Sequence, residues 1–256
     1  MCNKDLFFRS FGSGKPLVIL HGILGSSDIW VPTARYLSAY YRVIVPDLPN
    51  HGNSFHTKTL HCDDMAEEIE HFLHRNGIQN PIMMGHSYGG KIVLSMAAKK
   101  YIDMEKIILI DITSEQQTNI NMQNVFEFLN FPLPDFASFA EAKNYFELQF
   151  ADKNISDLLL KGLKRSGKTL VWRWNTQVLG QQYSQILQPI ALPQVCHIPL
   201  LLIKGEKSDY VTQNGIHLLE KAFANFSTAN VPDAGHWLHA DNFDGFIQSL
   251  SAFLQL

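Results

Sequence analysis

Cysteine is scarce in this sequence of 256 residues. Only Cys2, Cys62 and Cys196 are present, an odd number at wide spacing. A disulfide-stapled domain needs paired cysteines, and a structural zinc site needs cysteines or histidines at short spacing. The pattern argues against both and is typical of a protein from a reduced compartment. We therefore expect neither a metal site nor a cofactor.

The sequence also lacks long hydrophobic runs and a large excess of either positive or negative charge. The early apolar run Leu17–Leu20 is too short for the core of a signal peptide, and no run approaches the roughly 20 apolar residues of a membrane span. The net charge of −3 gives no reason to expect a nucleic-acid partner. We expect a soluble cytoplasmic protein, or a matrix-type protein in a eukaryotic source, that is a monomer or a small homo-oligomer.

Short apolar runs alternate with helix-like segments in the first part of the chain and again near its end. Such runs are typical of strands covered on both faces, and they occupy residues 17–20, 42–45, 81–84, 106–110 and 199–203. The alternation predicts an α/β fold with a mostly parallel twisted sheet and helices on both faces.

The alternation stops in the middle of the chain, where the pattern predicts several helices, near residues 119–129, 138–150 and 155–164. We therefore predict one core built from residues 1–112 and 195–256. A helical cap, residues 113–194, is inserted after the strand that ends at Asp111.

The segment Gly85-His86-Ser87-Tyr88-Gly89-Gly90 lies between an apolar strand-like run and a helix-like run. A Gly-x-Ser-x-Gly pattern in a strand-to-helix corner is typical of a nucleophile elbow. The serine at such a corner has a strained backbone, and a Cβ atom on either flanking glycine would collide with a neighbouring strand or helix.

Four motifs in order resemble the α/β-hydrolase family over the whole chain. They read His21–Ser26, Asn50–Ser54, Gly85–Gly90 with the following Ile110-Asp111-Ile112, and Ala234-Gly235-His236-Trp237-Leu238-His239. More narrowly, the chain is similar to a branch of small bacterial acyl esterases and thioesterases and their mitochondrial relatives. The resemblance implies a serine hydrolase in which nucleophile, acid and histidine follow in that chain order.

By this resemblance, Ser87 is the nucleophile and His236 is the general base. A serine hydroxyl near neutral pH needs an adjacent base to take its proton. His236 lies in the loop after the last expected strand, at the carboxyl edge of the sheet where sites of this kind form. His21, His51 and His86 lie near the same edge, in motifs where the family uses histidine structurally.

The acid has two candidates. Asp111 follows the strand next to the elbow, whereas Asp209 lies in the turn after residues 199–203, where most members of the family carry their acid. The usual spacing there is Gly-x-x-Asp, and the residue three after Gly205 is Ser208, so Asp209 is one place late. We favour Asp111 and keep Asp209 as the alternative, with Ser208 as a supporting residue.

The oxyanion is expected to bind two backbone N–H groups, those of Ile23 and Tyr88. His21 and Gly22 support the loop that holds Ile23. In this reading the identity of the side chains matters less than the shape of the loop.

Aromatic residues crowd the predicted cap, where they can form its own small core and also line an apolar chamber. Lys161, Lys164, Arg165 and Lys168 form a basic cluster there. Such a cluster is usually a solvated face, and the alternative is a landing site for an anionic acyl carrier such as coenzyme A.

The sequence thus predicts a carboxylic ester hydrolase (esterase or thioesterase) with a Ser-His-Asp triad. It would cleave small-molecule esters or acyl thioesters of apolar acyl groups through an acyl-enzyme. One alternative keeps the triad but cleaves C–C bonds, as a hydrolase or lyase of the menaquinone or aromatic-degradation type. The other is a ligand receptor of slow turnover on the same fold.

Overall fold

The computed structural model describes residues 5–117, 122–192 and 195–256. Its main sheet has seven strands in the order β1-β3-β2-β4-β5-β8-β9. The strands are β1 (Phe8–Phe11), β2 (Pro16–Leu20), β3 (Arg42–Pro46), β4 (Ile82–His86), β5 (Lys106–Ile110), β8 (Leu200–Gly205) and β9 (Phe226–Val231). Only β1 pairs antiparallel, at the edge of the sheet, so the expected mostly parallel sheet is confirmed.

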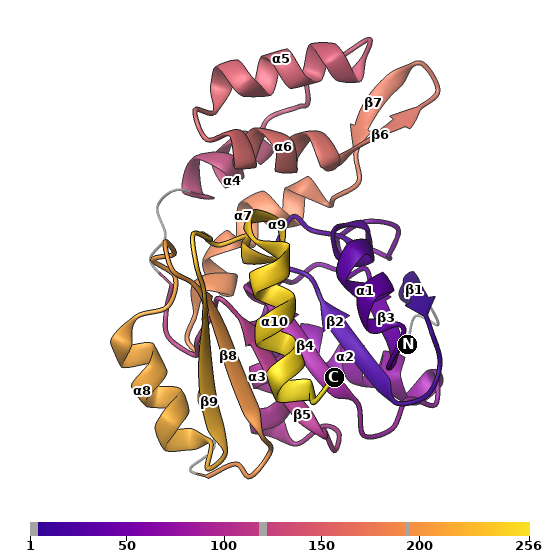
Figure 1. The fold of residues 1–256 in the computed structure, drawn as a ribbon. Helices are drawn as coiled ribbons and strands as arrows, with labels where there is room; N and C mark the ends of the chain where they lie inside the picture. The colour runs from indigo at the N-terminus through magenta and orange to yellow at the C-terminus, as the bar shows by residue number, and fades with distance from the viewer. Residues whose placement is uncertain (1–4, 118–121, 193–194) are drawn as a thin grey trace.

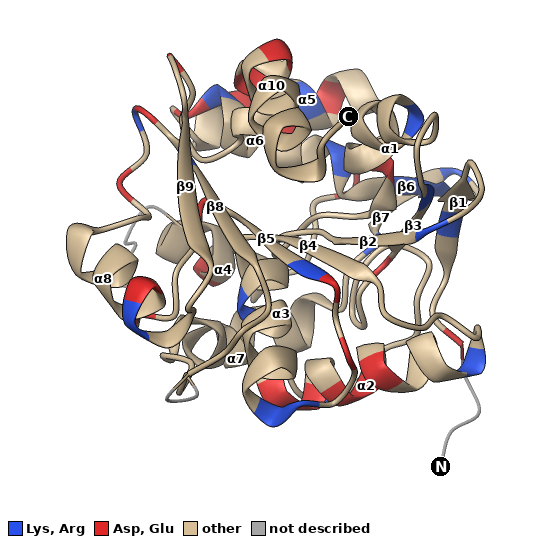
Figure 2. Ribbon diagram, turned by 60° about the horizontal axis from the view of Figure 1, so that its bottom comes forward, with Lys and Arg blue, Asp and Glu red and all other residues tan. Residues whose placement is uncertain are grey.

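Helices cover both faces of this sheet (Figure 2). One face packs against α1 (Val31–Leu37) and α10 (Phe243–Leu254), and the other against α2 (Cys62–Arg75), α3 (Tyr88–Lys99) and α8 (Gln213–Ala222). Alternate side chains of a strand point to opposite faces. In β8, accordingly, Leu200 and Leu202 join the cluster with α3, while Leu201 and Ile203 join the cluster with α10. The uninterrupted apolar runs of the sequence follow from this double coverage.

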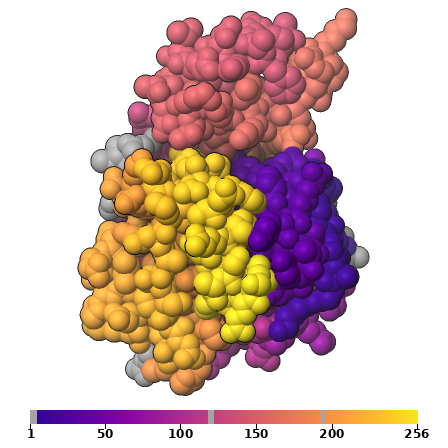
Figure 3. Space-filling model, in the orientation of Figure 1, coloured from indigo at the N-terminus to yellow at the C-terminus, as the bar shows by residue number. Residues whose placement is uncertain are grey.

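The segment between β5 and β8 lies over the carboxyl ends of the parallel strands (Figures 1 and 3), and we call it the cap. It contains α4 (Gln123–Leu129), α5 (Phe139–Gln149), α6 (Lys153–Lys161), the hairpin β6 (Leu163–Ser166) and β7 (Thr169–Trp172), and α7 (Thr176–Leu187). The expectation of helices alone is wrong here, because α6 ends at Lys161 and a hairpin follows. A Cβ atom on Gly162 would lie 2.1 Å from the Trp174 ring, so close packing at this glycine accompanies the change of direction. The predicted helix start near residue 119 lies outside the described residues.

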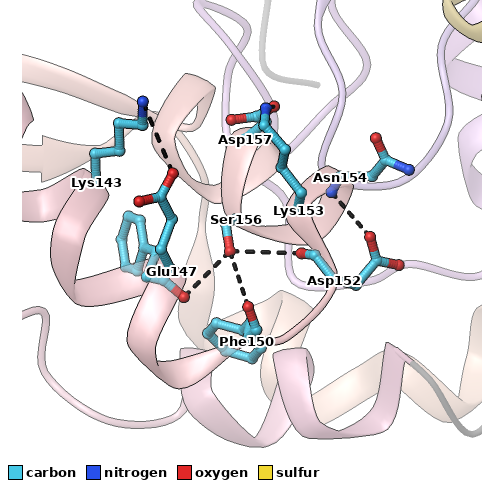
Figure 4. A network of polar contacts seen from close by, with 9 residues as sticks. Lys143, Glu147, Phe150, Asp152, Lys153, Asn154, Ser156 and Asp157 are labelled. Atoms are coloured by element: carbon cyan, nitrogen blue, oxygen red, sulfur yellow. Dashed lines mark hydrogen bonds and ion pairs between the residues drawn. The ribbon is translucent and has the colours of Figure 1, made fainter.

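The distal part of the cap has an aromatic core of its own. Phe146 stacks on Trp172 with ring centroids 5.8 Å apart, Trp172 stacks on Trp174 at 5.1 Å, and Phe128 contacts Phe146 edge-on. The buried Ser156 hydroxyl lies within 3.4 Å of three backbone carbonyls at the junction of α5 and α6 (Figure 4). These contacts fix α5, α6 and the hairpin to one another.

Helix α7, by contrast, is bonded to the core. The backbone N–H of Asn175 donates to the Asn50 carbonyl at 3.0 Å, and its side-chain amide donates to the Asn50 side chain at 3.0 Å. The buried Lys91 ammonium of α3 donates to the carbonyls of Ile186 (3.1 Å) and Gln188 (2.5 Å) at the carboxyl end of α7. Hydrogen bonds at both ends therefore hold α7 against the core, next to α3.

Cys62 and Cys196 are free thiols, and Cys2 lies outside the described residues. Within the described part of the chain, no helix has the length and apolar character to cross a bilayer.

Candidate active site

Ser87 occupies a sharp corner between β4 and α3. Its backbone has φ 51° and ψ −119°, in the region that favours glycine, and its N–H donates to the Ile110 carbonyl at 3.0 Å. A Cβ on Gly85 would lie 2.5 Å from the Gly89 carbonyl oxygen, and one on Gly89 would lie 2.4 Å from that of Leu20. The predicted glycine requirement is thus confirmed, and it places the amino end of α3 against β2.

Asp111 and His236 are in direct contact. Asp111 follows β5, the neighbour of the elbow strand, and has a positive φ of 52° that turns it out of the sheet. Its side chain is fully buried, and its Oδ2 lies 2.7 Å from Nδ1 of His236. The contact fixes which imidazole nitrogen carries the proton, since the carboxylate accepts a hydrogen bond from Nδ1–H and leaves Nε2 as an acceptor.

Two further donors complete the surroundings of the Asp111 carboxylate. The Gly205 N–H donates to Oδ1 at 3.1 Å, and the Ser208 hydroxyl donates to Oδ2. Asp209, the alternative acid, is exposed, whereas the carboxylate that contacts His236 is that of Asp111. The turn therefore brings Ser208, and not Asp209, to the buried carboxylate.

The loop that carries His236 is held from two sides. Nε2–H of the buried His86 donates to the His236 carbonyl at 2.9 Å. The Tyr210 ring stacks on the His236 imidazole with centroids 3.5 Å apart and planes 12° apart. The imidazole is thereby confined in orientation as well as in tautomer.

Two buried histidines shape the loop of Ile23. The His21 imidazole accepts from the Leu48 N–H at 2.9 Å, and the His51 imidazole accepts from the Leu24 N–H at 3.1 Å. Burial lowers the pKa of His21 to about 4 and that of His51 to about 3, so both rings stay neutral and both acceptors persist near neutral pH.

Gly22 leaves no room for a side chain, because a Cβ there would lie 2.9 Å from Nδ1 of His86. The loop therefore runs close beside the elbow. Tyr88 is the first residue of α3, so its N–H has no partner within the helix. Ile23 and Tyr88 both line one pocket with Ser87, so the two residues expected to hold the oxyanion lie around the same cavity as the serine.

Each of three hollows is lined by Ser87, by His236 or by both. The inner cavity is lined by both of them together with Trp30, His86, Trp237 and His239. The side pocket is lined by Ser87 and by mainly apolar residues of the core and the cap, among them Ile112, Met122, Tyr183, Ile186 and Leu187. The outer mouth is lined by His236 and by polar residues, among them Asp152, Lys207, Ser208, Asp209 and Asp241.

Several residues of the site carry no role in the sequence-based predictions. Tyr210 follows Asp209 directly but gave no signal, because its stacking depends on a loop far along the chain. Lys91 lies one helical turn after Ser87, a spacing that places it beside the nucleophile. Among the described residues, no group of three or more His, Cys, Asp or Glu side chains is arranged to hold a metal ion.

The basic cluster lies at the end of α6 and in the hairpin β6–β7. None of Lys161, Lys164, Arg165 and Lys168 is among the residues that line the three hollows. A role in binding an acyl carrier remains a hypothesis.

Comparison with known proteins places this geometry in a family. Residues 15–243 match the family of the α/β-hydrolase fold. The sn-1-specific diacylglycerol lipase ABHD11 of Danio rerio is 27% identical over 97% of this chain and 81% of its own length. Esterase YbfF of Escherichia coli is 28% identical over 94% of both chains.

A solved structure, described as a marine microorganism esterase, has a TM-score of 0.92 and 30% sequence identity, and the match covers 98% of this chain and all of the other. The predicted resemblance to small bacterial esterases is confirmed by these relatives. The chain belongs to the α/β-hydrolase family.

Proposed function

We propose that this protein is a serine hydrolase that cleaves carboxylic esters or acyl thioesters of apolar acyl groups. The observation that carries the proposal is the 2.7 Å contact between Asp111 and His236 at a cavity that Ser87 also lines. A buried carboxylate, an imidazole held in one tautomer and a serine on a strained corner are the parts that acyl transfer requires.

In the proposed reaction, Ser87 Oγ bonds to the carbonyl carbon of the substrate while its proton passes to Nε2 of His236. The carbonyl oxygen becomes an oxyanion that the N–H groups of Ile23 and Tyr88 bind, each worth about 3 kcal/mol in the transition state. Collapse of this intermediate breaks the bond to the alcohol or thiol, which leaves with the proton from His236. Water then repeats the sequence on the acyl-Ser87 ester and releases the acid.

Asp111 is the proposed acid of the triad. It holds the Nδ1 proton and stabilises the imidazolium that forms during attack, while it stays ionised itself. Ser208 and the Gly205 N–H hold the carboxylate in place, and His21 and Gly22 hold the loop of Ile23.

The apolar acyl group is proposed to occupy the side pocket. The lining of this pocket comes largely from Ile112, Met122, Ile186 and Leu187, which offer burial for a hydrocarbon chain. Two of these residues belong to α7, so we infer that residues 113–194 act as the cap of the active site and help to set the acyl preference.

The test uses p-nitrophenyl esters of increasing acyl length, together with labelling by an organophosphonate. We expect fast multiple turnover, and we expect Ser87→Ala to lose both turnover and labelling. Ser227→Ala, at an exposed position on β9, is the matched control and should keep both.

Two other outcomes would refute the proposal. Turnover of a diketone without turnover of any ester would favour the C–C hydrolase. Labelling at Ser87 without multiple turnover would favour the slow receptor.

A further inference from the structure

Tyr210 lies directly against the imidazole that the proposed reaction uses as its base. The ring centroids of Tyr210 and His236 are 3.5 Å apart, and the ring planes differ by 12°. Carbon atoms of two stacked rings do not approach much closer than about 3.5 Å. The two rings therefore lie almost centre over centre, with little offset.

A centred stack is an unfavourable arrangement for two neutral aromatic rings. Both faces carry partial negative charge, so neutral pairs favour an offset or an edge-on contact. The other parallel stacks in the described part of the chain have centroids 3.9 to 5.8 Å apart, which leaves room for that offset. A centred stack becomes favourable when one ring is a cation, because the positive charge then lies over the negative face of the other ring.

The imidazole of His236 becomes such a cation in the proposed reaction, each time that it takes a proton from Ser87 or from water. An interaction that strengthens with this charge stabilises the transition state more than the ground state, and it therefore raises kcat. The Asp111 carboxylate, 2.7 Å from Nδ1, provides one such interaction. The aromatic face of Tyr210 provides a second one.

The neighbouring histidine rings do not oppose this charge. Burial holds the pKa of His86 well below its usual range and lowers that of His239 to about 3, so both rings stay neutral near neutral pH. The planes of His86 and Trp237 are tilted from that of His236 by 40° and 70°. Among the described residues whose rings contact His236, Tyr210 is the one that lies parallel to it.

A short turn holds the tyrosine in this place. The backbone N–H of Tyr210 donates to the Ser208 hydroxyl oxygen at 3.3 Å, and that hydroxyl donates to Oδ2 of Asp111. Asp111 accepts from His236, and His236 stacks on Tyr210, so the four residues close a ring of contacts. The same turn leaves Asp209 exposed. The position of the stacked ring is thus tied to the position of the buried carboxylate.

We propose that Tyr210 is a positioning residue of the reaction, whose ring stabilises the imidazolium of His236 by a cation–π contact and so speeds both formation and hydrolysis of the acyl-enzyme. This inference rests on the proposed ester hydrolysis and adds one residue to it. Tyr210 also lines all three hollows, so a role as a pocket wall is the competing explanation.

The test compares three replacements of Tyr210 in steady-state hydrolysis of a p-nitrophenyl ester. Tyr210→Phe keeps the ring, and we expect kcat within about threefold of the wild type. Tyr210→Leu keeps an apolar side chain without an aromatic face, and we expect kcat to fall about 5- to 30-fold while KM changes less than about twofold. Pentafluorophenylalanine at position 210 keeps the shape of the ring but reverses the charge of its face, and kcat should fall at least as far as in Tyr210→Leu.

The fluorinated ring separates the two explanations, because it fills the same space as phenylalanine. It does so even if Tyr210→Leu folds poorly. Tyr40→Leu makes the same exchange at an exposed tyrosine, and it should keep both kcat and KM.

Two results would overturn the inference and leave the proposed function intact. One is a fluorinated variant with the kcat of Tyr210→Phe, which would leave Tyr210 as a pocket wall. The other is Tyr210→Leu with a raised KM and an unchanged kcat. If the wild-type protein hydrolyses no p-nitrophenyl ester, the proposed function fails, and this inference fails with it.

Discussion

The exchange Asp111→Asn is the sharpest test of the proposed triad, because it keeps the shape of the side chain and changes only its hydrogen bonding. The carboxylate accepts from three donors: the Gly205 N–H on Oδ1, and the Ser208 hydroxyl and His236 Nδ1 on Oδ2. An asparagine has one oxygen and one NH₂ group. If the NH₂ group faces Gly205, two donors meet in a fully buried place, at a cost of about 1–3 kcal/mol.

The other orientation is the less costly one, because it turns the NH₂ group toward His236. The Ser208 hydroxyl can rotate to accept, but the imidazole must then move its proton to Nε2. In that tautomer His236 cannot take the proton of Ser87. We expect kcat to fall about 10³- to 10⁴-fold with little change in KM, since the lost interaction acts in the transition state.

The assay is steady-state hydrolysis of a p-nitrophenyl ester near pH 7, with thermal unfolding measured on each variant. Asp209→Asn is the control, and we expect less than a threefold change because that side chain is exposed and the buried Asp111 is the carboxylate on the His236 imidazole. The reasoning is refuted if a folded Asp111→Asn keeps more than a tenth of the activity, or if Asp209→Asn loses as much.

Two other predictions concern α3. In Gly89→Ala the new methyl carbon would lie 2.4 Å from the backbone oxygen of Leu20, so we expect the free energy of unfolding in urea to fall by about 3 kcal/mol; a stability equal to the wild type would contradict the close approach. Burial lowers the pKa of Lys91 from 10.5 to about 8, so the unfolded chain binds more protons than the folded one between these pH values. The free energy of unfolding should therefore rise from pH 8 to pH 10.5, by about 3 kcal/mol from this residue. In Lys91→Met the free energy of unfolding should not show this rise with pH, whereas Lys99→Met, at the exposed end of the same helix, should keep it. Equal pH profiles for Lys91→Met and the wild type would contradict the lowered pKa of Lys91.

The sequence predicted best what depends on short stretches of chain. The corner at Ser87 could be predicted because its glycines lie within five residues of one another, and their close contacts follow from the strand-to-helix turn itself. The parallel sheet could be predicted because strands buried on both faces leave continuous apolar runs. The hairpin after α6 was missed, because the expected helix ran on through residue 164 and the sequence gives no sign that Gly162 packs against the Trp174 ring, twelve residues further on.

What the sequence left open depends on contacts between distant segments. The acid remained a choice between Asp111 and Asp209, because a shift of one residue in the turn after β8 decides which side chain faces inward. The structure puts Ser208 against Asp111 and leaves Asp209 exposed. His239 stood in a recognised motif, yet its unpaired nitrogens follow from its packing on Trp30, more than 200 residues earlier.

The hydrogen bond between Ser208 and Asp111 has a consequence for how such sites change during evolution. The ends of β5 and β8 are adjacent, and Ser208 after β8 contacts the same carboxylate that accepts from the imidazole. A lineage that moves its acid from one strand end to the other by single substitutions passes through one of two ancestors, with no acid or with acids at both 111 and 208. Two carboxyl groups this close cannot both ionise easily, so the pKa of one of them would be raised well above the usual value of a carboxyl group. The doubly acidic ancestor would still offer the imidazole one carboxylate while the second carboxyl keeps its proton, and the ancestor without an acid would offer none.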